Sequence, residues 1–327
     1  MPVCQAGDAN LGDAEEEFDS PETIAALRGA LESLGHEVTL LGDGEPMFRR
    51  LLDEPRPEMV FNIAEGRGCA RDREARVPAV LETLGIPYTG SDPLTLAAAL
   101  DKDCAKRLVR DAGVSTPRWV FVDGSFSDDV AAQLDLLPLP VFIKPAFEGS
   151  SKGIVGSNLI ADRAELHEAV ARLSETYRQP ILVEEFIDGD ELTVGIIGHE
   201  PTDVLGIMRV VPKQKDVPFV YGLDVKRDWR RRVEYECPAQ LSAADVQTVR
   251  RAALRAWRAL GCRDVARLDF RLRAGVAYFL EANPLPGLAP GSGDLILMAE
   301  AMGVSHVGVI DRIVQAAIER QSLSLAV

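Results

Sequence analysis

Hydrophobic and polar positions follow helical and extended spacing in turn from the start of the chain. Apolar residues at helical spacing lie between Ser20–Pro21 and Gly35, which predicts a helix with these residues at its two ends. A second helix is expected to end at Gly85. Three short apolar runs predict strands: 37–41, 59–63 and 86–89. This order of helices and strands predicts a parallel sheet in the N-terminal part of the chain.

The opening strand of such a sheet is weak in this sequence. A domain of this kind normally begins with an apolar strand, and residues 1–7 make a poor one. Two explanations stay open: the first strand is short and irregular, or the sequence starts downstream of the true first residue.

From about residue 93 the pattern changes. Asp162 and Glu165 are expected to cap one helix reciprocally, and Ser242 begins a long helix that Gly261 ends. Strands are predicted at 140–145, 181–186, 191–198, 203–210, 265–272 and 276–282, and further helices at 103–111, 293–302 and 305–320. The fold class is α/β, with α+β character in the C-terminal part. The chain is expected to divide into three domains: 1–92, 93–182 and 183–327.

Composition narrows the class of protein. The 327 residues carry a net charge of −15, which argues against binding of nucleic acid through its phosphates. No apolar run approaches the roughly 18 residues that span a bilayer. The N-terminus has no basic residue among its first twenty, unlike a signal peptide. Five cysteines without C-x-x-C spacing indicate a reducing compartment. We therefore expect a cytoplasmic enzyme that binds neither membrane nor nucleic acid.

The clearest chemical signal lies on two consecutive predicted strands near the C-terminus. Glu281 and Asn283 are two residues apart and share a face of one strand. If the strands form a hairpin, Asp269 joins them in a cluster of oxygen ligands suited to Mg²⁺. The simpler interpretation is a solvated sheet face. The rigid Asn-Pro-Leu-Pro-Gly run after Ala282 favours a shaped site.

Two further motifs indicate a phosphate and nucleotide site. Lys144 ends an apolar strand, and the small residues of 148–153 allow backbone N–H groups to approach phosphate oxygens. A hairpin tip explains this loop equally well. Glu184, Glu185 and Glu191 lie where a strand enters a linker, although a solvated edge is the commoner meaning of such acids.

Lysine is scarce in this chain. Only 7 of the 36 basic residues are Lys, which leaves 29 Arg. Lys102, Lys144, Lys152 and Lys226 all lie in the candidate motifs or in the segments associated with them. This concentration predicts local positive charge for an anionic ligand in an acidic protein.

In this order and spacing the motifs resemble the ATP-grasp superfamily, and within it the D-alanine–D-alanine ligase family. The resemblance covers essentially the whole chain. It is carried by the segments Gly85–Ser91, Leu100–Lys102, Ile143–Pro145, Glu148–Gly153, Glu184–Gly189, Cys237–Ala239, Arg267–Phe270 and Glu281–Gly287. It implies an ATP-grasp fold preceded by a Rossmann-like parallel-sheet domain.

The resemblance also implies a ligand for each motif. ATP is expected between the central and C-terminal domains. Its expected contacts are Lys102, Lys144, Ser151, Glu184, Glu185, Ile187, Glu191 and, from a mobile loop, Lys226. Two Mg²⁺ ions, with Mn²⁺ as an alternative, are expected on Asp269, Glu281 and Asn283. Amino acids are the implied substrates, and a homodimer is an expectation of the resemblance alone.

The implied reaction joins a donor carboxylate to an acceptor amine through an acyl phosphate. Arg267 and the backbone N–H of Gly287 are the implied oxyanion stabilisers, Lys226 contacts the γ-phosphate, and Ser150 organises the donor side. Glu17 corresponds to a residue for the donor ammonium and Ser292 to one for the acceptor carboxylate.

Two departures from the family pattern affect the substrate. Glu65 replaces a histidine beside the substrate pocket, and Arg227 replaces the tyrosine after the loop lysine. The first hypothesis is D-alanine–D-alanine ligation for peptidoglycan precursors. The second is a related ligase for other amino acids or peptides in specialised metabolism. A nucleotide-binding protein without ligase activity is a third, weaker hypothesis.

Overall fold

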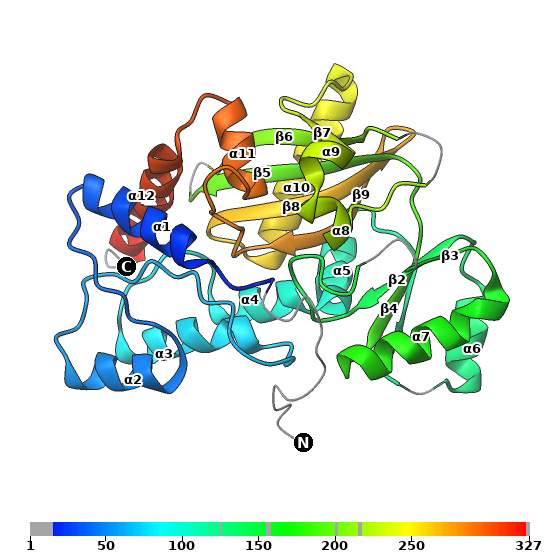
Figure 1. Cartoon of the computed structure of the whole chain (residues 1–327), viewed down its shortest axis with the longest axis horizontal. Helices are drawn as coiled ribbons and strands as arrows, with labels where there is room; N and C mark the ends of the chain where they lie inside the picture. Colours follow the sequence, from blue (N-terminus) through cyan, green and yellow to red (C-terminus); the bar gives the residue numbers. More distant parts are fainter. Residues whose placement is uncertain (1–15, 125, 155–157, 200–201, 215–217, 325–327) are drawn as a thin grey trace.

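The computed structural model describes residues 16–324 except 125, 155–157, 200–201 and 215–217. Two antiparallel sheets lie next to each other, and a layer of helices from the N-terminal part packs against the larger one (Figure 1). No helix of the described residues is long and apolar enough to cross a membrane.

The N-terminal layer is helical. It consists of α1 (Pro21–Ser33), α2 (Gly44–Asp53), the 3₁₀ turn η1 (Arg73–Ala75), α3 (Arg76–Leu84) and α4 (Pro93–Leu100). The predicted start of α1 at Ser20 and the predicted end of α3 at Gly85 are confirmed. The Ser20 hydroxyl accepts a hydrogen bond from Thr23 N at 3.2 Å, and Gly85 closes α3 with a φ of 65°.

The predicted parallel sheet of this layer is reduced, within the described residues, to one parallel bridge between Val60 and Tyr88. Val60 donates to Pro87 O at 2.8 Å and accepts from Thr89 N at 3.0 Å. The strand predicted at 37–41 is not formed, so that prediction is wrong. Most of this segment is exposed, and no strand of the described residues pairs with it. The predicted opening strand lies outside the described residues.

The smaller sheet has the order β1-β4-β2-β3. Its strands are β1 (Trp119–Val122), β2 (Val141–Pro145), β3 (Leu159–Ile160) and β4 (Ile181–Glu185). Helices α6 (Asp128–Asp135) and α7 (Arg163–Tyr177) cover one face through a single apolar cluster (Figure 1). Asp162 caps α7 by accepting from Ala164 N at 2.9 Å, so the cap is simpler than the reciprocal one predicted.

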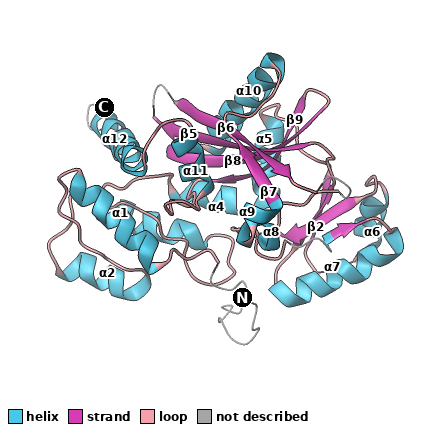
Figure 2. Cartoon of the chain, turned by 45° about the horizontal axis from the view of Figure 1, so that its top comes forward, coloured by secondary structure: helices cyan, strands magenta, loops and turns pink. Residues whose placement is uncertain are grey.

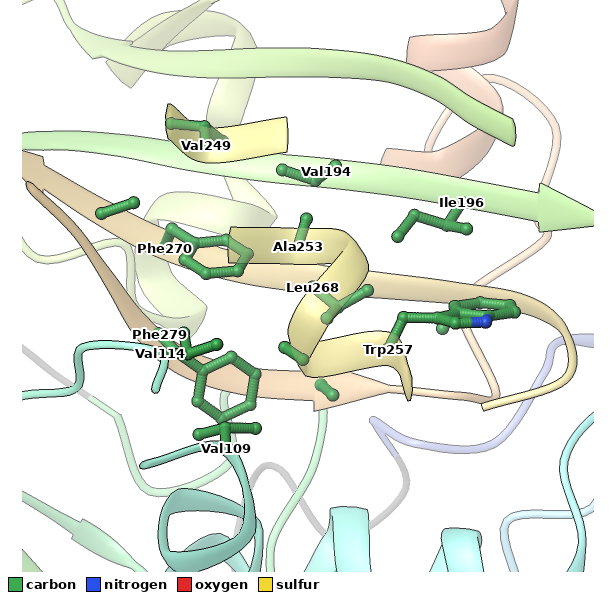
Figure 3. Packing of buried hydrophobic residues seen from close by; sticks show 14 of the residues in the cluster. Val109, Val114, Val194, Ile196, Val249, Ala253, Trp257, Leu268, Phe270 and Phe279 are labelled. Atoms are coloured by element: carbon green, nitrogen blue, oxygen red, sulfur yellow. The ribbon is translucent and has the colours of Figure 1, made fainter. Parts of the chain in front are cut away.

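The larger sheet has the order β7-β6-β5-β8-β9. Its strands are β5 (Asp190–Gly198), β6 (Asp203–Pro212), β7 (Val233–Glu236), β8 (Asp264–Arg273) and β9 (Val276–Asn283). One face packs on α5 (Lys102–Asp111) and α10 (Ala243–Leu260), where Trp257, Phe270 and Phe279 meet (Figure 3). Because side chains alternate across a strand, the opposite face buries Ile197 and Val265.

This opposite face packs on α11 (Asp294–Ala301) and α12 (His306–Ser324), and α1 lies beside α12 (Figure 2). Two short helices, α8 (Leu223–Arg227) and α9 (Trp229–Arg232), connect β6 to β7. The division at residues 92 and 182 stays a prediction. β4 continues to Glu185 inside the smaller sheet, and α5 packs against the larger one.

Candidate functional site

A cavity of about 730 Å³ lies between the two sheets. It receives side chains from β2 and β4 on one side, from β5, β8 and β9 on the other, and from the segment before α8. Its lining contains most of the residues predicted to bind nucleotide or metal: Lys144, Ser151, Glu184, Glu185, Ile187, Glu191, Lys226, Asp269 and Glu281. The structure therefore brings these residues together from widely separated parts of the chain.

Three buried charges lie on the β2–β4 side, with Lys144 and Glu184 in the cavity lining and Lys106 on α5 next to them. Glu184 accepts from Lys144 at 2.8 Å and from Lys106 at 2.7 Å, and all three side chains are at most 5% exposed. Burial lowers the pKa of Lys106 to about 8, against the opposing effect of Glu184. Burial also favours the neutral form of Lys144, but Glu184 and Glu281 outweigh it and raise its pKa. Sequence reasoning missed Lys106, although it lies four residues after Lys102 on the same face of α5.

The predicted hairpin of β8 and β9 is confirmed, and it brings the oxygen ligands together. Asp269 lies opposite Glu281 and Arg267 opposite Asn283, with a register shift after Asp269. Asn283 Nδ2 donates to Asp269 Oδ2 at 3.3 Å, and Thr193 Oγ1 donates to Asp269 Oδ1 at 3.0 Å. The cluster combines two carboxylates that line the cavity between the sheets with one amide, Asn283, which lines the two neighbouring cavities.

Positive side chains surround Glu281. Lys102 Nζ lies 3.5 Å from its carboxylate and also donates to the backbone carbonyl of Glu148. Burial alone would raise the pKa of Glu281, but the charges of Lys102, Lys144 and Arg267 outweigh burial and lower it to about 2. This carboxylate therefore stays ionised at any physiological pH.

Arg267 is held between two aspartates. Its Nη2 lies 3.0 Å from Asp269 Oδ2 and its Nη1 lies 3.1 Å from Asp294 Oδ2, while its buried Nε has no hydrogen-bond partner among the described residues. Tyr221 Oη donates to Asp294 at 3.4 Å and shares a short hydrogen bond with Tyr235. Lys226 Nζ lies 5.3 Å from the centre of the Tyr221 ring. Asp294 and Tyr221 were not identified from the sequence.

Arg271 holds the linker after β4 in place. It pairs with Glu191 and donates to the carbonyls of Gly189 at 3.2 Å and Phe219 at 2.7 Å. Ile187 is buried beside it, and its carbonyl is a weaker acceptor at 3.5 Å. Glu185, also in the cavity lining, pairs with Arg273 at 3.1 Å. The backbone around residues 187–191 is therefore rigidly positioned at the cavity edge.

The loop after β2 is tied to the N-terminal layer through Glu17. Glu17 Oε1 accepts from Arg73 at 2.6 Å and from Gly149 N at 2.6 Å, and Lys152 lies 3.3 Å from Oε2. Glu17 is thus already neutralised by protein cations. Ser150 and Ser151 adopt positive φ values of 47° and 60°, a conformation that is strained for residues with a side chain and often found at functional sites.

A second, larger cavity of about 1720 Å³ adjoins the first. Lys226, Arg267, Tyr221 and Asp294 line both cavities. The predicted substrate and oxyanion residues also line the larger one: Glu17, Glu65, Ser150, Gly287 and Ser292. Lys102 lies outside both, in a third, smaller cavity next to Ser150.

Arg227 joins the loop helix α8 to the N-terminal segment. Its Nε donates to Glu16 Oε1 at 2.9 Å, and both residues line the larger cavity. Trp229 and Arg230 follow on the same wall. Acidic groups from the N-terminal layer thus face basic and aromatic groups from the loop across one cavity.

The chain is similar to known proteins over most of its length. The family model of the D-ala D-ala ligase C-terminus matches residues 108–315. A D-alanine–D-alanine ligase of Synechococcus sp. (strain JA-3-3Ab) is 32% identical, over 96% of this chain and 93% of the relative. An uncharacterised protein, y4sG, of Sinorhizobium fredii is 35% identical, over 89% of this chain and 86% of its own.

The fold is shared with solved structures as well. The D-alanine–D-alanine ligase of Bacillus anthracis in complex with ATP superposes with a TM-score of 0.74 at 23% identity, covering 94% of this chain and 97% of that one. This likeness confirms the predicted α/β ATP-grasp fold. The chain belongs to the D-alanine–D-alanine ligase family, a group of ATP-dependent ligases.

Proposed function

We propose that this protein is an ATP- and Mg²⁺-dependent ligase that joins the carboxylate of one amino acid to the amine of another. One observation carries the proposal: Lys226 and Arg267 line both the cavity between the sheets and the larger cavity beside it. A nucleotide in the first and amino acids in the second would meet at these two cations. Phosphoryl transfer and acyl transfer both require positive charge at that place.

The nucleotide is assigned to the cavity between the sheets. Lys144 and Lys226 line this cavity and are assigned to the phosphates. Lys102, whose Nζ lies 3.5 Å from the Glu281 carboxylate, is assigned to them as well. The rigid backbone near Ile187, together with Glu191, is placed to hydrogen-bond adenine and ribose. Ser151 and the neighbouring N–H groups of its loop would cover the phosphates.

The donor set on the β8–β9 hairpin fits Mg²⁺. Asp269, Glu281 and Asn283 supply hard oxygen atoms, and Mg²⁺ takes its remaining ligands from phosphate and water. The described residues contain no cluster of three or more His, Cys, Asp and Glu side chains, so the protein alone does not complete a metal shell. This agrees with ions that bind together with nucleotide. Bound magnesium would neutralise phosphate charge, and we expect two ions, with Mn²⁺ as an alternative.

The chain's own residues account for the acyl-transfer step. The donor carboxylate takes the γ-phosphoryl group and becomes an acyl phosphate, and the acceptor amine then attacks this carbonyl and expels phosphate. Arg267 and Gly287 N–H are assigned to the developing oxyanion. The guanidinium is pre-oriented by its two aspartates, which reduces reorganisation during the reaction.

D-Alanine as both donor and acceptor is our first assignment, because relatives of this chain are named D-alanine–D-alanine ligases. A ligase for other amino acids or peptides is the alternative. Glu65 and the Arg227–Glu16 pair favour it, since they put charged groups on the wall of the substrate cavity. Glu17 and Ser292 are assigned to the donor ammonium and the acceptor carboxylate.

Release of ADP and phosphate with D- and L-amino acids, singly and in pairs, tests the proposal. We expect release that requires Mg²⁺ and an amino acid. Lys144→Met should abolish it, whereas Lys213→Met, which changes an exposed lysine outside all three cavities, should retain it. No release with any amino acid would overturn the ligase assignment. Faster turnover of another pair than of D-alanine would establish the alternative.

A further inference from the structure

The third cavity, next to Ser150, contains acidic groups that the proposed reaction does not use. Glu65 and Glu74 both line it, and Glu65 also lines the larger substrate cavity. Ser150 and Asn283 are shared by the two cavities as well. At about 420 Å³ against 1720 Å³, the third cavity is a small extension of the substrate cavity on the donor side.

Glu74 is buried without a partner. It is 6% exposed, and it makes no hydrogen bond or ion pair with any described residue. The nearest cations are engaged elsewhere: Arg73 with Glu17 and the Phe147 carbonyl, and Lys102 with Glu281 and the Glu148 carbonyl. A buried carboxylate with no donor is costly, so such a group normally has a ligand or takes up a proton.

Glu65 increases the negative charge at this place. It makes no hydrogen bond or ion pair with a described residue, in contrast to Glu17, which Arg73 and Lys152 neutralise. Burial raises the pKa of Glu65, and the charges of Glu74 and Glu17 raise it further. A cation between the two carboxylates would remove both the desolvation cost and the repulsion.

We propose that Glu65 and Glu74 form a subsite for a cationic side chain of the donor, which is therefore a diamino acid or another amino acid with a basic side chain. The inference rests on the proposed ligase function, and it favours the alternative to D-alanine named there by specifying the donor. Lys226 and Arg267 line the substrate cavity but not the smaller one. The donor carboxylate must reach these two residues. The α-ammonium is attached to the carbon next to that carboxylate and stays near it. A side-chain ammonium extends several carbons further and can therefore reach the smaller cavity.

A comparison of donor amino acids tests the proposed subsite directly. ADP release is followed with lysine, ornithine or 2,4-diaminobutyrate as donor, in both configurations, against alanine and norleucine, which matches lysine without its charge. We expect kcat/KM for the best diamino acid to exceed that of norleucine by at least about tenfold, as one charge-assisted contact implies. Glu65→Gln and Glu74→Gln should reduce this ratio about tenfold, while Asp72→Asn, an exposed carboxylate outside all three cavities, should not.

Each other outcome decides against the subsite in a different way. Alanine and norleucine used as well as the diamino acids would overturn it and leave the ligase function standing. Equal losses for alanine and lysine in both variants would assign the carboxylates to the α-ammonium instead. Stabilisation by Mg²⁺ or Ca²⁺ alone that Glu74→Gln abolishes would assign them to a metal. No ADP release with any amino acid would remove the ligase function itself.

A binding measurement covers the case in which a variant folds poorly. Calorimetric titration of the unmodified protein with lysine and with norleucine, in the presence of Mg²⁺ and a non-hydrolysable ATP analogue, compares the two side chains without any substitution. We expect at least about tenfold tighter binding of lysine. Equal affinities would contradict the proposal.

Discussion

Arg267 shows how single side chains define this site. Two aspartates, Asp269 and Asp294, bind its two terminal nitrogens, and all three side chains are at most 15% exposed. Asp269 also belongs to the proposed metal set, whereas Asp294 lies on α11 and contacts Tyr221 from the loop. Asp294 is therefore a positioning residue that connects the guanidinium to the segment carrying Lys226.

We expect Asp294→Asn to lower kcat about tenfold, because a neutral amide holds the guanidinium less firmly and an oxyanion contact is worth a few kcal/mol. The KM for ATP should change little, since Asp294 lies at the substrate end of the nucleotide cavity. Steady-state ADP release measures both parameters. Glu300→Gln, an exposed change on the same helix, is the matched control. An increased KM for ATP with unchanged kcat would contradict the positioning role.

Glu74 makes a pH-dependent contribution to stability. Burial raises its pKa to about 7, with Arg73 and Lys102 opposing burial and Glu17 adding to it. Because the folded-state pKa lies above the usual value, the proton stabilises the fold fully below about pH 4.5, and this contribution is lost as pH rises through 7.

Glu74→Gln should therefore stabilise the ligand-free protein at pH 8 and have little effect near pH 4.5. A pKa shift of this size corresponds to roughly 3 kcal/mol as an upper estimate. Urea unfolding at both pH values measures the difference, with Asp72→Asn as control. A variant that is less stable than the parent at pH 8 would show that the carboxylate is paired in the folded state.

At the scale of elements, a surface ion pair joins α8 to the segment before α1, and both of its residues line the substrate cavity. Arg227 of α8 reaches Glu16 in the segment before α1. Their side chains are 51% and 32% exposed, and an ion pair of this kind contributes at most about 1 kcal/mol. The contact is thus too weak to affect global stability, yet strong enough to bias the position of the loop.

Reversing this pair tests its role. Arg227→Glu should make the loop about two- to fivefold more sensitive to limited proteolysis, as loss of up to about 1 kcal/mol implies. The double variant Glu16→Arg with Arg227→Glu should restore the original rate, while the midpoint of thermal unfolding stays unchanged throughout. If the double variant is as sensitive as the single one, the charge pair does not hold the loop.

Two elements show which local sequence patterns are sufficient to determine secondary structure. Ser242 accepts from Asp245 N at 3.1 Å and Gly261 has a φ of 75°, so both ends of α10 lie where cap chemistry predicted them. The segment 37–41 has an equally clear apolar pattern but forms no strand. A cap is satisfied within a few residues, whereas a strand requires a partner that only the fold can provide.

At the scale of the molecule, a buried ion pair between α12 and the larger sheet also binds the backbone of the N-terminal layer. Arg320 on α12 donates to both oxygens of Asp264 on β8, at 3.0 and 2.7 Å, and to the Tyr88 carbonyl at 2.8 Å. Asp264 also accepts from Gly90 N at 2.8 Å and is fully buried. Together with the ion pair between Arg263 and Asp92, these contacts hold the N-terminal layer against the sheet.

Arg320→Met should destabilise the protein by about 3–5 kcal/mol, because it leaves the Asp264 charge buried without its cation. Urea unfolding gives the free energy, and Arg312→Met, an exposed arginine on the same helix, should change it by less than about 0.5 kcal/mol. Similar small effects for both variants would show that Asp264 is neutralised by other groups.

The sequence by itself determined the family, the hairpin with Asp269 and Glu281, and the concentration of lysines, because each depends on local order and spacing. Three of the seven lysines, Lys102, Lys144 and Lys226, line the three cavities, and Lys106, which no motif identified, pairs with Glu184 of the cavity lining. Only the tertiary structure decided which charges are neutralised. Glu17 is paired and Glu74 is not, since partners such as Arg73 and Lys152 arrive from distant segments. The proposed donor specificity rests on that difference, and burial and pairing are properties of the folded chain.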